Sequence, residues 1–140
     1  MATDRQRSGM RGVFLVAGEL SRLRYSVALT ARNAAGADLM VFSAATAEAR
    51  SIEVKTNSKR ANFWLVNERA REVSAPSHFY VFVNISSTKD DAERFEYFVV
   101  PSAVVARKTV VQKGETSTWY SFSLNDAEPY RSKWSQLGKQ

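Results

Sequence analysis

Three residues of this chain have the types and spacing needed for chemistry on a phosphate ester: Asp38, Glu53 and Lys55. Two carboxylates held close together repel each other unless a cation lies between them, and Mg²⁺ prefers oxygen ligands of this kind. Such a cation lowers the pKa of a bound water and stabilises charge on a phosphoryl oxygen. A neighbouring lysine orients or deprotonates that water, or neutralises the phosphate. The three residues therefore indicate phosphodiester hydrolysis.

A predicted β-hairpin brings these three residues together. Its strands cover 38–44 and 50–57, joined by the turn residues TAEA. Because side chains alternate along a strand, Glu53 and Lys55 share one face, and the apolar neighbours Ile52 and Val54 share the other. The alternative for Glu53 and Lys55 is an exposed ion pair, which would contribute less than ~1 kcal/mol.

The rest of the pattern predicts one α/β domain over residues 1–140, with a mixed sheet flanked by helices. Pro101 suits the first turn of a helix, which we expect to run through SAVVARKTVVQ to near Gly114. We expect a terminal helix with Asn125 or Asp126 as its N-cap and Gly138 at its end. The remaining predicted elements are a helix over 8–24 and strands at 25–30, 62–66, 78–85, 95–100 and 118–124.

Composition excludes several classes of active site. The chain has no cysteine and one histidine, His78. A thiolate nucleophile, a disulfide scaffold, a cysteine-ligated zinc and a two-histidine metal motif are therefore impossible. No segment approaches the ~18 apolar residues of a membrane span, and Asp4 and Glu19 make the N-terminal segment a poor signal peptide. We expect a cytoplasmic protein without membrane contact.

The net charge of +6 is uneven along the chain. Residues 1–60 contain ten Lys/Arg and five Asp/Glu, whereas residues 61–140 contain ten and nine. A basic half beside a nearly neutral one favours a polyanionic partner, most simply nucleic acid.

The motif GAD at 36–38, followed by IEVKT at 52–56, resembles the PD-(D/E)XK nuclease superfamily, in its small archaeal Holliday-junction-resolvase-like branch. The leading segment VAGELSRL and the later HFYVFVNI and FEYFVVPS extend the resemblance in order over most of the chain, with Ala37 in place of the motif's proline. The resemblance implies a restriction-endonuclease-like fold and a metal-dependent nuclease acting on DNA, including structured or branched DNA. It also implies Mg²⁺ (or Mn²⁺) on Asp38 and Glu53, Lys55 as the catalytic lysine, and a homodimer.

One departure from the family pattern concerns the first helix. These families often carry a glutamate there, at a place that corresponds to Val13 in this chain. The acid actually available is Glu19, which becomes the fourth candidate catalytic residue. If Glu19 does not act as a catalytic residue, the alternative is a catalytically inactive nucleic-acid-binding module that keeps the nuclease fold. An accessory protein whose fold serves protein contacts is a third possibility.

Four polar residues near the predicted site are candidates for contacts with nucleic acid. Lys59 and Arg60 directly follow the strand of Glu53, and Arg32 and Asn33 precede Asp38. Such residues contact phosphates without regard to sequence. The alternative for Lys59 and Arg60 is a solvated turn.

Two aromatic residues and the histidine have structural alternatives. Phe63 and Trp64 have the chemistry to stack on splayed bases, whereas an aromatic pair on a short strand more often belongs to the core. We assign His78, which stands before a core strand, a structural role.

Overall fold

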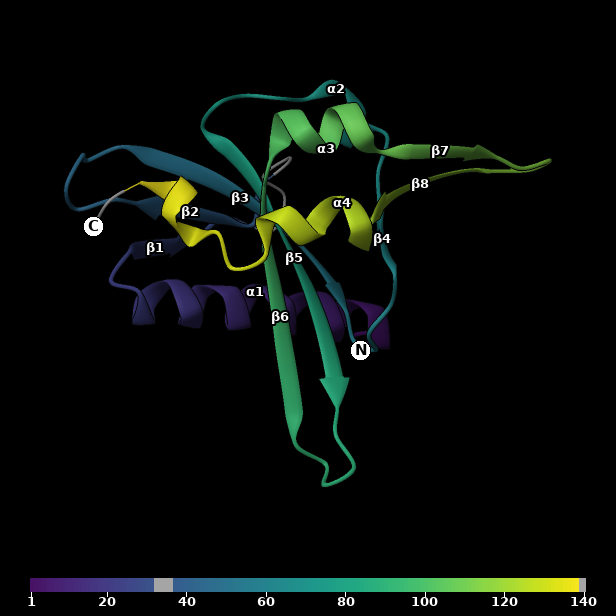
Figure 1. Ribbon diagram of the computed structural model, residues 1–140, viewed down its shortest axis with the longest axis horizontal. Coiled ribbons are helices and arrows are strands. Elements are labelled where there is room, and N and C mark those ends of the chain that lie inside the picture. The colour runs from purple at the N-terminus through teal and green to yellow at the C-terminus, as the bar shows by residue number, and fades with distance from the viewer. Residues whose placement is uncertain (32–36, 139–140) are drawn as a thin grey trace.

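A computed structural model of the chain describes residues 1–31 and 37–138. Two twisted sheets and several helices make up the fold (Figure 1). None of the helices in these residues is long and apolar enough to cross a membrane. The elements are, in chain order, α1 (Asp4–Arg22), β1 (Ser26–Leu29), β2 (Leu39–Phe42), β3 (Ala49–Asn57), β4 (Phe63–Val66), α2 (Arg69–Glu72), β5 (His78–Ser87), β6 (Glu93–Pro101), α3 (Ser102–Lys108), β7 (Val110–Lys113), β8 (Thr118–Ser123), α4 (Leu124–Ala127) and the 3₁₀ helices η1 (Glu128–Tyr130) and η2 (Trp134–Leu137).

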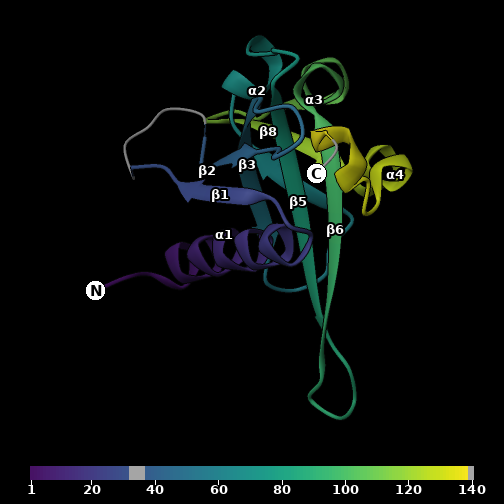
Figure 2. The ribbon, with the colours of Figure 1, turned by 90° about the vertical axis from the view of Figure 1, so that its left-hand side faces the viewer.

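The larger sheet has five strands in the order β1-β2-β3-β5-β6. Strands β3 and β5 are parallel, and the other three neighbouring pairs are antiparallel. The smaller sheet has the order β4-β8-β7 and is antiparallel. Helix α1 lies on one side of the larger sheet, and α3 and α4 lie on the other (Figures 1 and 2). The predicted α/β fold with a mixed sheet flanked by helices is confirmed.

Each face of the larger sheet has its own hydrophobic core. Strand β5 contributes to both, because Val81 and Val83 pack in the core that contains Val16 of α1, whereas Phe82 packs against Trp64 on the other side. A strand buried on both faces has a nearly continuous apolar sequence, as 78–85 does. Each such fully buried side chain contributes roughly 1.5–3 kcal/mol relative to exposure. The sheet is therefore covered on both faces where β3 and β5 meet.

Helix α1 begins earlier than predicted and lies directly against β3. Thr3 is its N-cap in a capping box with Gln6, which satisfies backbone groups of the first turn. A Cβ atom added to Gly12 would stand 1.7 Å from Oγ1 of Thr56, so only glycine permits this approach. The helix backbone therefore packs on the face of β3 that carries Ile52, Val54 and Thr56.

Two helix predictions near the C-terminus are wrong. The helix after Pro101 ends at Lys108, and β7 follows, because Val110 and Val111 are β-branched and pair with β8 across a turn at Gly114. The expected terminal helix is replaced by α4, η1 and η2, and the N-cap of α4 is Ser123 rather than Asn125 or Asp126. Pro129, which lacks an amide hydrogen, prevents a continuous helix there.

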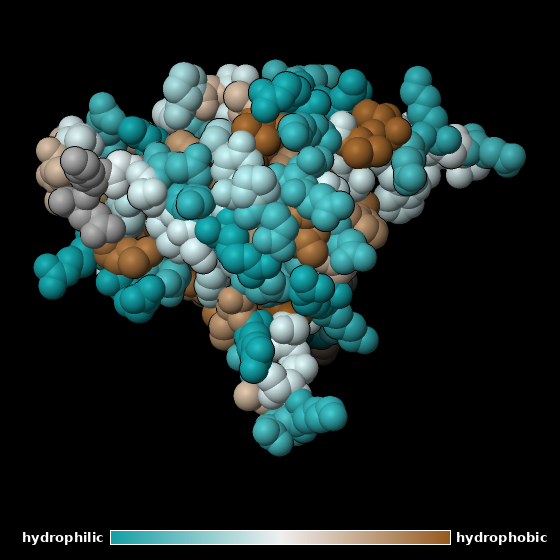
Figure 3. Space-filling model, in the orientation of Figure 1, coloured by the Kyte–Doolittle hydropathy of each residue, from teal (hydrophilic) through white to brown (hydrophobic). Residues whose placement is uncertain are grey.

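The surface seen in Figure 3 is mostly hydrophilic, and its hydrophobic side chains form separate small patches. Scattered apolar side chains of this kind are normal on a protein surface. Two hairpins extend from the body, β5–β6 and β7–β8 (Figure 1).

Candidate functional site

The candidate site lies where β3 continues beyond the end of β2. The pairing of the two strands reaches only from Ala49 to Ile52, so β3 has a free edge from Glu53 onward on that side. Asp38 stands at the start of this free edge. Its amide donates to the carbonyl oxygen of Ile52 at 2.8 Å, and its Oδ2 accepts from the amide of Val54 at 2.7 Å. The carboxylate is thereby attached to the residue between Glu53 and Lys55.

Glu53 and Lys55 point to the same face of β3 and contact each other. Nζ of Lys55 lies 3.5 Å from Oε1 of Glu53, and their side chains are 26% and 15% exposed, respectively. The simple ion pair is therefore formed. Asp38 joins it as a third charged group, since both Glu53 and Lys55 act electrostatically on its carboxyl group.

The environment of Asp38 disfavours the charged form of its carboxyl group. Burial raises the pKa of its carboxyl group above the ordinary value, and the charge of Glu53 raises it further. The hydrogen bond from Val54 and the charge of Lys55 act in the opposite direction without reversing the shift. A cation between the two carboxylates would relieve this repulsion.

The donor set fits a hard divalent cation. Asp38 and Glu53 offer carboxylate oxygens, and the carbonyl of Val54 points to the same free edge, because the amide and carbonyl of one strand residue face the same neighbour. Among residues 1–31 and 37–138, no three His, Cys, Asp or Glu side chains form a metal-holding group. Mg²⁺ commonly binds through one or two carboxylates and retains several waters, so two carboxylates suffice.

A small recess of about 30 Å³ adjoins Glu53. Tyr80 stands opposite Glu53 in the parallel register of β3 and β5. Burial, the charge of Glu53 and a hydrogen bond to it raise the pKa of Tyr80. Sequence reasoning missed Tyr80, because the apolar run of β5 marks a strand but does not show its register against β3. The recess is lined by Glu53, Asn67, Arg69, Val73, His78 and Tyr80.

His78 has the structural role expected of it. Its Nδ1 lies 2.6 Å from Oγ of Ser51, and its ring meets that of Tyr80 edge-on with 5.5 Å between the centroids. Burial lowers the pKa of His78. The histidine supports the wall of the recess.

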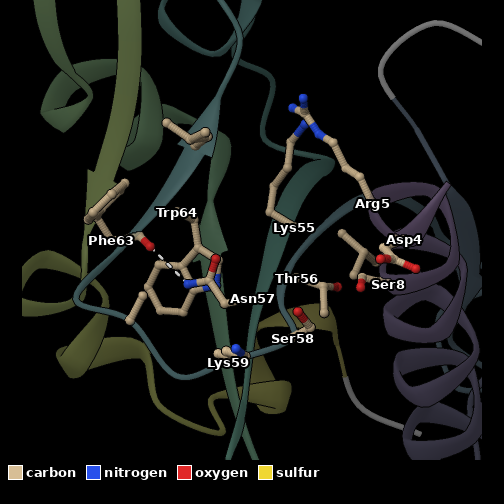
Figure 4. A pocket seen from close by; sticks show the side chains of 14 residues that line it. Asp4, Arg5, Ser8, Lys55, Thr56, Asn57, Ser58, Lys59, Phe63 and Trp64 are labelled. Atoms are coloured by element: carbon tan, nitrogen blue, oxygen red, sulfur yellow. Dashed lines mark hydrogen bonds between the residues drawn. The ribbon is translucent and has the colours of Figure 1, made fainter.

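A second and larger hollow, a cleft of about 600 Å³, opens beside Lys55. Figure 4 shows Arg5 and Ser8 of α1 on one side of it, Phe63 and Trp64 of β4 on the other, and Lys55 between them. Val54 and Lys55 line it too, so the cleft adjoins the charged cluster at Lys55.

The structure does not bring Glu19 to Asp38 and Glu53. Glu19 forms an ion pair with Arg22 on α1, which packs on the opposite face of β3 from Glu53. Its charge acts on Tyr97 of β6, beyond β5 from the free edge of β3. The lowered pKa of Glu19 comes from its hydrogen bond with Arg22.

The predicted nucleic-acid contacts separate into three groups. Lys59 lines the cleft. Arg60 instead contacts Glu96 at 2.8 Å, and Arg131 contacts the other oxygen of the same carboxylate at 2.7 Å. Arg32 and Asn33 lie outside the described residues.

No protein-family model matches the chain, and no curated protein matches it. Its structure is similar to that of a bacterial homing endonuclease, I-Ssp6803I, with a TM-score of 0.59 and 13% sequence identity. The similarity covers 98% of this chain and 92% of the endonuclease chain. The chain therefore has a nuclease-like fold.

Proposed function

We propose that this protein is a nuclease that hydrolyses phosphodiester bonds of DNA with the help of a divalent cation. The observation that carries the proposal is the attachment of Asp38 to Val54, which sets two carboxylates and a lysine at one free strand edge. The nuclease-like fold and the adjoining cleft support it.

In this proposal, Asp38 and Glu53 would hold Mg²⁺ or Mn²⁺ together with the carbonyl of Val54. A cation bound there supplies a Lewis acid for the phosphate and a water of lowered pKa. The amide of Val54 keeps the Asp38 carboxylate in place. Lys55 lines the cleft and stabilises the charge that develops on the phosphate in the transition state, or orients the attacking water.

Finer features rest on the resemblance in the sequence. They include membership of the PD-(D/E)XK superfamily, a preference for structured or branched DNA, and a homodimer that cuts both strands. A cytoplasmic location is part of the same proposal.

A catalytically inactive DNA-binding module is the second candidate, and the position of Glu19 favours it. With Glu19 paired to Arg22, the described residues supply the cluster with two carboxylates, those of Asp38 and Glu53. An inactive module would bind DNA through the cleft and leave it intact.

The test is incubation with linear, supercoiled, single-stranded and four-way-junction DNA in Mg²⁺, in Mn²⁺ and in EDTA. A nuclease cleaves at least one of these DNAs in Mg²⁺ or Mn²⁺ and none of them in EDTA. The Asp38→Asn variant cleaves none of them in any condition. A gel shift without cleavage in any cation would replace the proposal by the inactive module. If the protein neither binds nor cleaves any of these DNAs, the accessory-protein alternative remains.

A further inference from the structure

The cleft beside Lys55 has an apolar wall as well as charged groups. Along β4, Trp64 is buried in the core, whereas Phe63 and Leu65 on either side of it are 49% and 40% exposed. All three line the cleft. The half-exposed ring of Phe63, at the β4 wall of the cleft, is accessible to a planar apolar group (Figure 4).

The charges around this aromatic wall are mainly positive. Arg5, Lys55 and Lys59 line the cleft, and the acid among the lining residues, Asp4, pairs with Arg7. In Figure 4, Arg5 and Lys55 extend from α1 and β3 in the same direction, and Lys59 lies near the other end. The cleft therefore combines cations with an exposed aromatic ring, which is how proteins bind single strands.

The segment that carries Lys59 and Phe63 is held firmly to the sheet. Asn84, fully buried on β5, accepts from Nδ2 of Asn57 at 3.0 Å and donates to the carbonyl of Ala61 at 3.1 Å. Nδ2 of Asn57 also donates to the carbonyl of Phe63 at 2.8 Å. Because these bonds fix the segment before any ligand arrives, binding loses less conformational entropy.

The size of the cleft suits one strand. A volume of about 600 Å³ falls within the ~300–1,000 Å³ of pockets that enclose a drug-sized ligand. This space accommodates individual nucleotides, whereas a duplex is far wider and hides the faces of its bases in the stack.

We propose that the cleft binds an unpaired strand of DNA, with a base stacked on Phe63 and its phosphates against Lys59 and Arg5. The strand then passes Lys55 at the charged cluster. The inference of single-strand binding depends on the cleft alone. Only cleavage of the bound strand rests on the proposed function.

The test measures binding in EDTA, so that cleavage does not interfere. Fluorescence anisotropy compares a labelled oligothymidine of about 12 nucleotides with a duplex of the same length. Phe63→Ala should weaken single-strand binding by at least about five-fold, as loss of one stacked base requires, and leave duplex binding unchanged. Phe63→Trp should retain single-strand binding.

The matched control is Trp119→Ala. Trp119 is 54% exposed on β8, pairs with Gln112 of the projecting hairpin and does not line the cleft. Loss of the Trp119 side chain should change neither the single-strand affinity nor the duplex affinity. The melting temperature of each variant establishes that the variant is folded.

The outcomes separate this inference from the proposed function. Unchanged single-strand affinity in Phe63→Ala, or an equal loss for both DNA forms, would overturn the stacking site even in an active nuclease. A selective loss in Phe63→Ala supports the site, including in a protein that cleaves no DNA with any cation.

Discussion

The carboxylate of Asp38 accepts a hydrogen bond from the backbone amide of Val54, with 2.7 Å between Oδ2 and N. Because Asp38 lies just before the first residue of β2, its side chain takes the place of a backbone partner for Val54 of β3. This one bond holds the acid at the free edge of β3, beside Glu53 and Lys55.

Asp38→Asn should keep the fold and abolish cation binding. The asparagine carbonyl can still accept from Val54, whereas the negative charge is lost. We expect a folded variant whose melting temperature is no lower than that of wild type, no heat of Mg²⁺ or Mn²⁺ binding in calorimetry, and no cleavage. Asp38→Ala is the control, since it also leaves the Val54 amide unpaired at a cost of about 1–3 kcal/mol. Wild-type cleavage by Asp38→Asn would remove Asp38 from the site.

The raised pKa of Asp38 predicts how stability depends on pH. Burial and the charge of Glu53 make the folded chain hold this proton more tightly than the unfolded chain, whose ordinary value is 3.8. The charged carboxylate therefore destabilises the fold above its raised pKa, and this destabilisation disappears as the pH falls toward 3.8. Without divalent cations, Asp38→Asn should exceed wild type in free energy of unfolding at pH 7, by a margin that shrinks on acidification. Denaturant titrations across pH measure it, and a margin that grows at low pH would contradict the assignment.

Lys55→Ala should separate catalysis from cation binding. Asp38 and Glu53 remain in this variant, and the loss of one positive charge favours a cation between them. We expect turnover to fall by about a hundred-fold or more, the loss typical of a transition-state donor, while calorimetry shows equal or tighter Mg²⁺ binding. A simple surface ion pair would instead leave cleavage unchanged and alter stability by less than ~1 kcal/mol.

Lys59→Ala and Arg60→Ala should differ although the residues are neighbours. Lys59 lines the cleft, whereas Arg60 is bound to Glu96. Loss of Lys59 should weaken binding to all DNA sequences and reduce the slope of log affinity against log salt by about one. Arg60→Ala should leave that slope unchanged. Binding titrations at several salt concentrations measure both, and equal slope changes would mean that Arg60 leaves Glu96 for the phosphate.

Gly12→Ala should be destabilising, and Gly18→Ala should not. A methyl group at Gly12 would overlap Oγ1 of Thr56, so α1 must move away from β3 at a cost of about 1–3 kcal/mol. No atom lies within 4 Å of the corresponding position at Gly18, where alanine should stabilise the helix by roughly 0.5–1 kcal/mol. Thermal denaturation of the two variants provides the comparison, and equal melting temperatures would rule out the close packing of α1 on β3.

Much of the fold could be predicted because its signals are local. Alternation of apolar side chains marks β3, and a continuous apolar run marks β5. The short turn between 42 and 49 makes β2 and β3 adjacent, so the sequence predicts that Asp38 lies near Glu53 and Lys55. The helix expected over 109–113 failed because pairing with β8 outweighed local helix propensity.

What the sequence by itself determined is the identity of the strands other than β7 and the proximity of the two carboxylates and the lysine, since a short hairpin leaves few alternatives. The tertiary structure alone decided which groups surround them. The register of β3 on β5 places Tyr80 against Glu53, the packing of α1 on the sheet places Glu19 near Tyr97 of β6, and Glu96 holds Arg60 from 36 residues along the chain. Such contacts depend on how distant segments pack together, and β3 and β5, which no tight turn joins, have no local signal for their register.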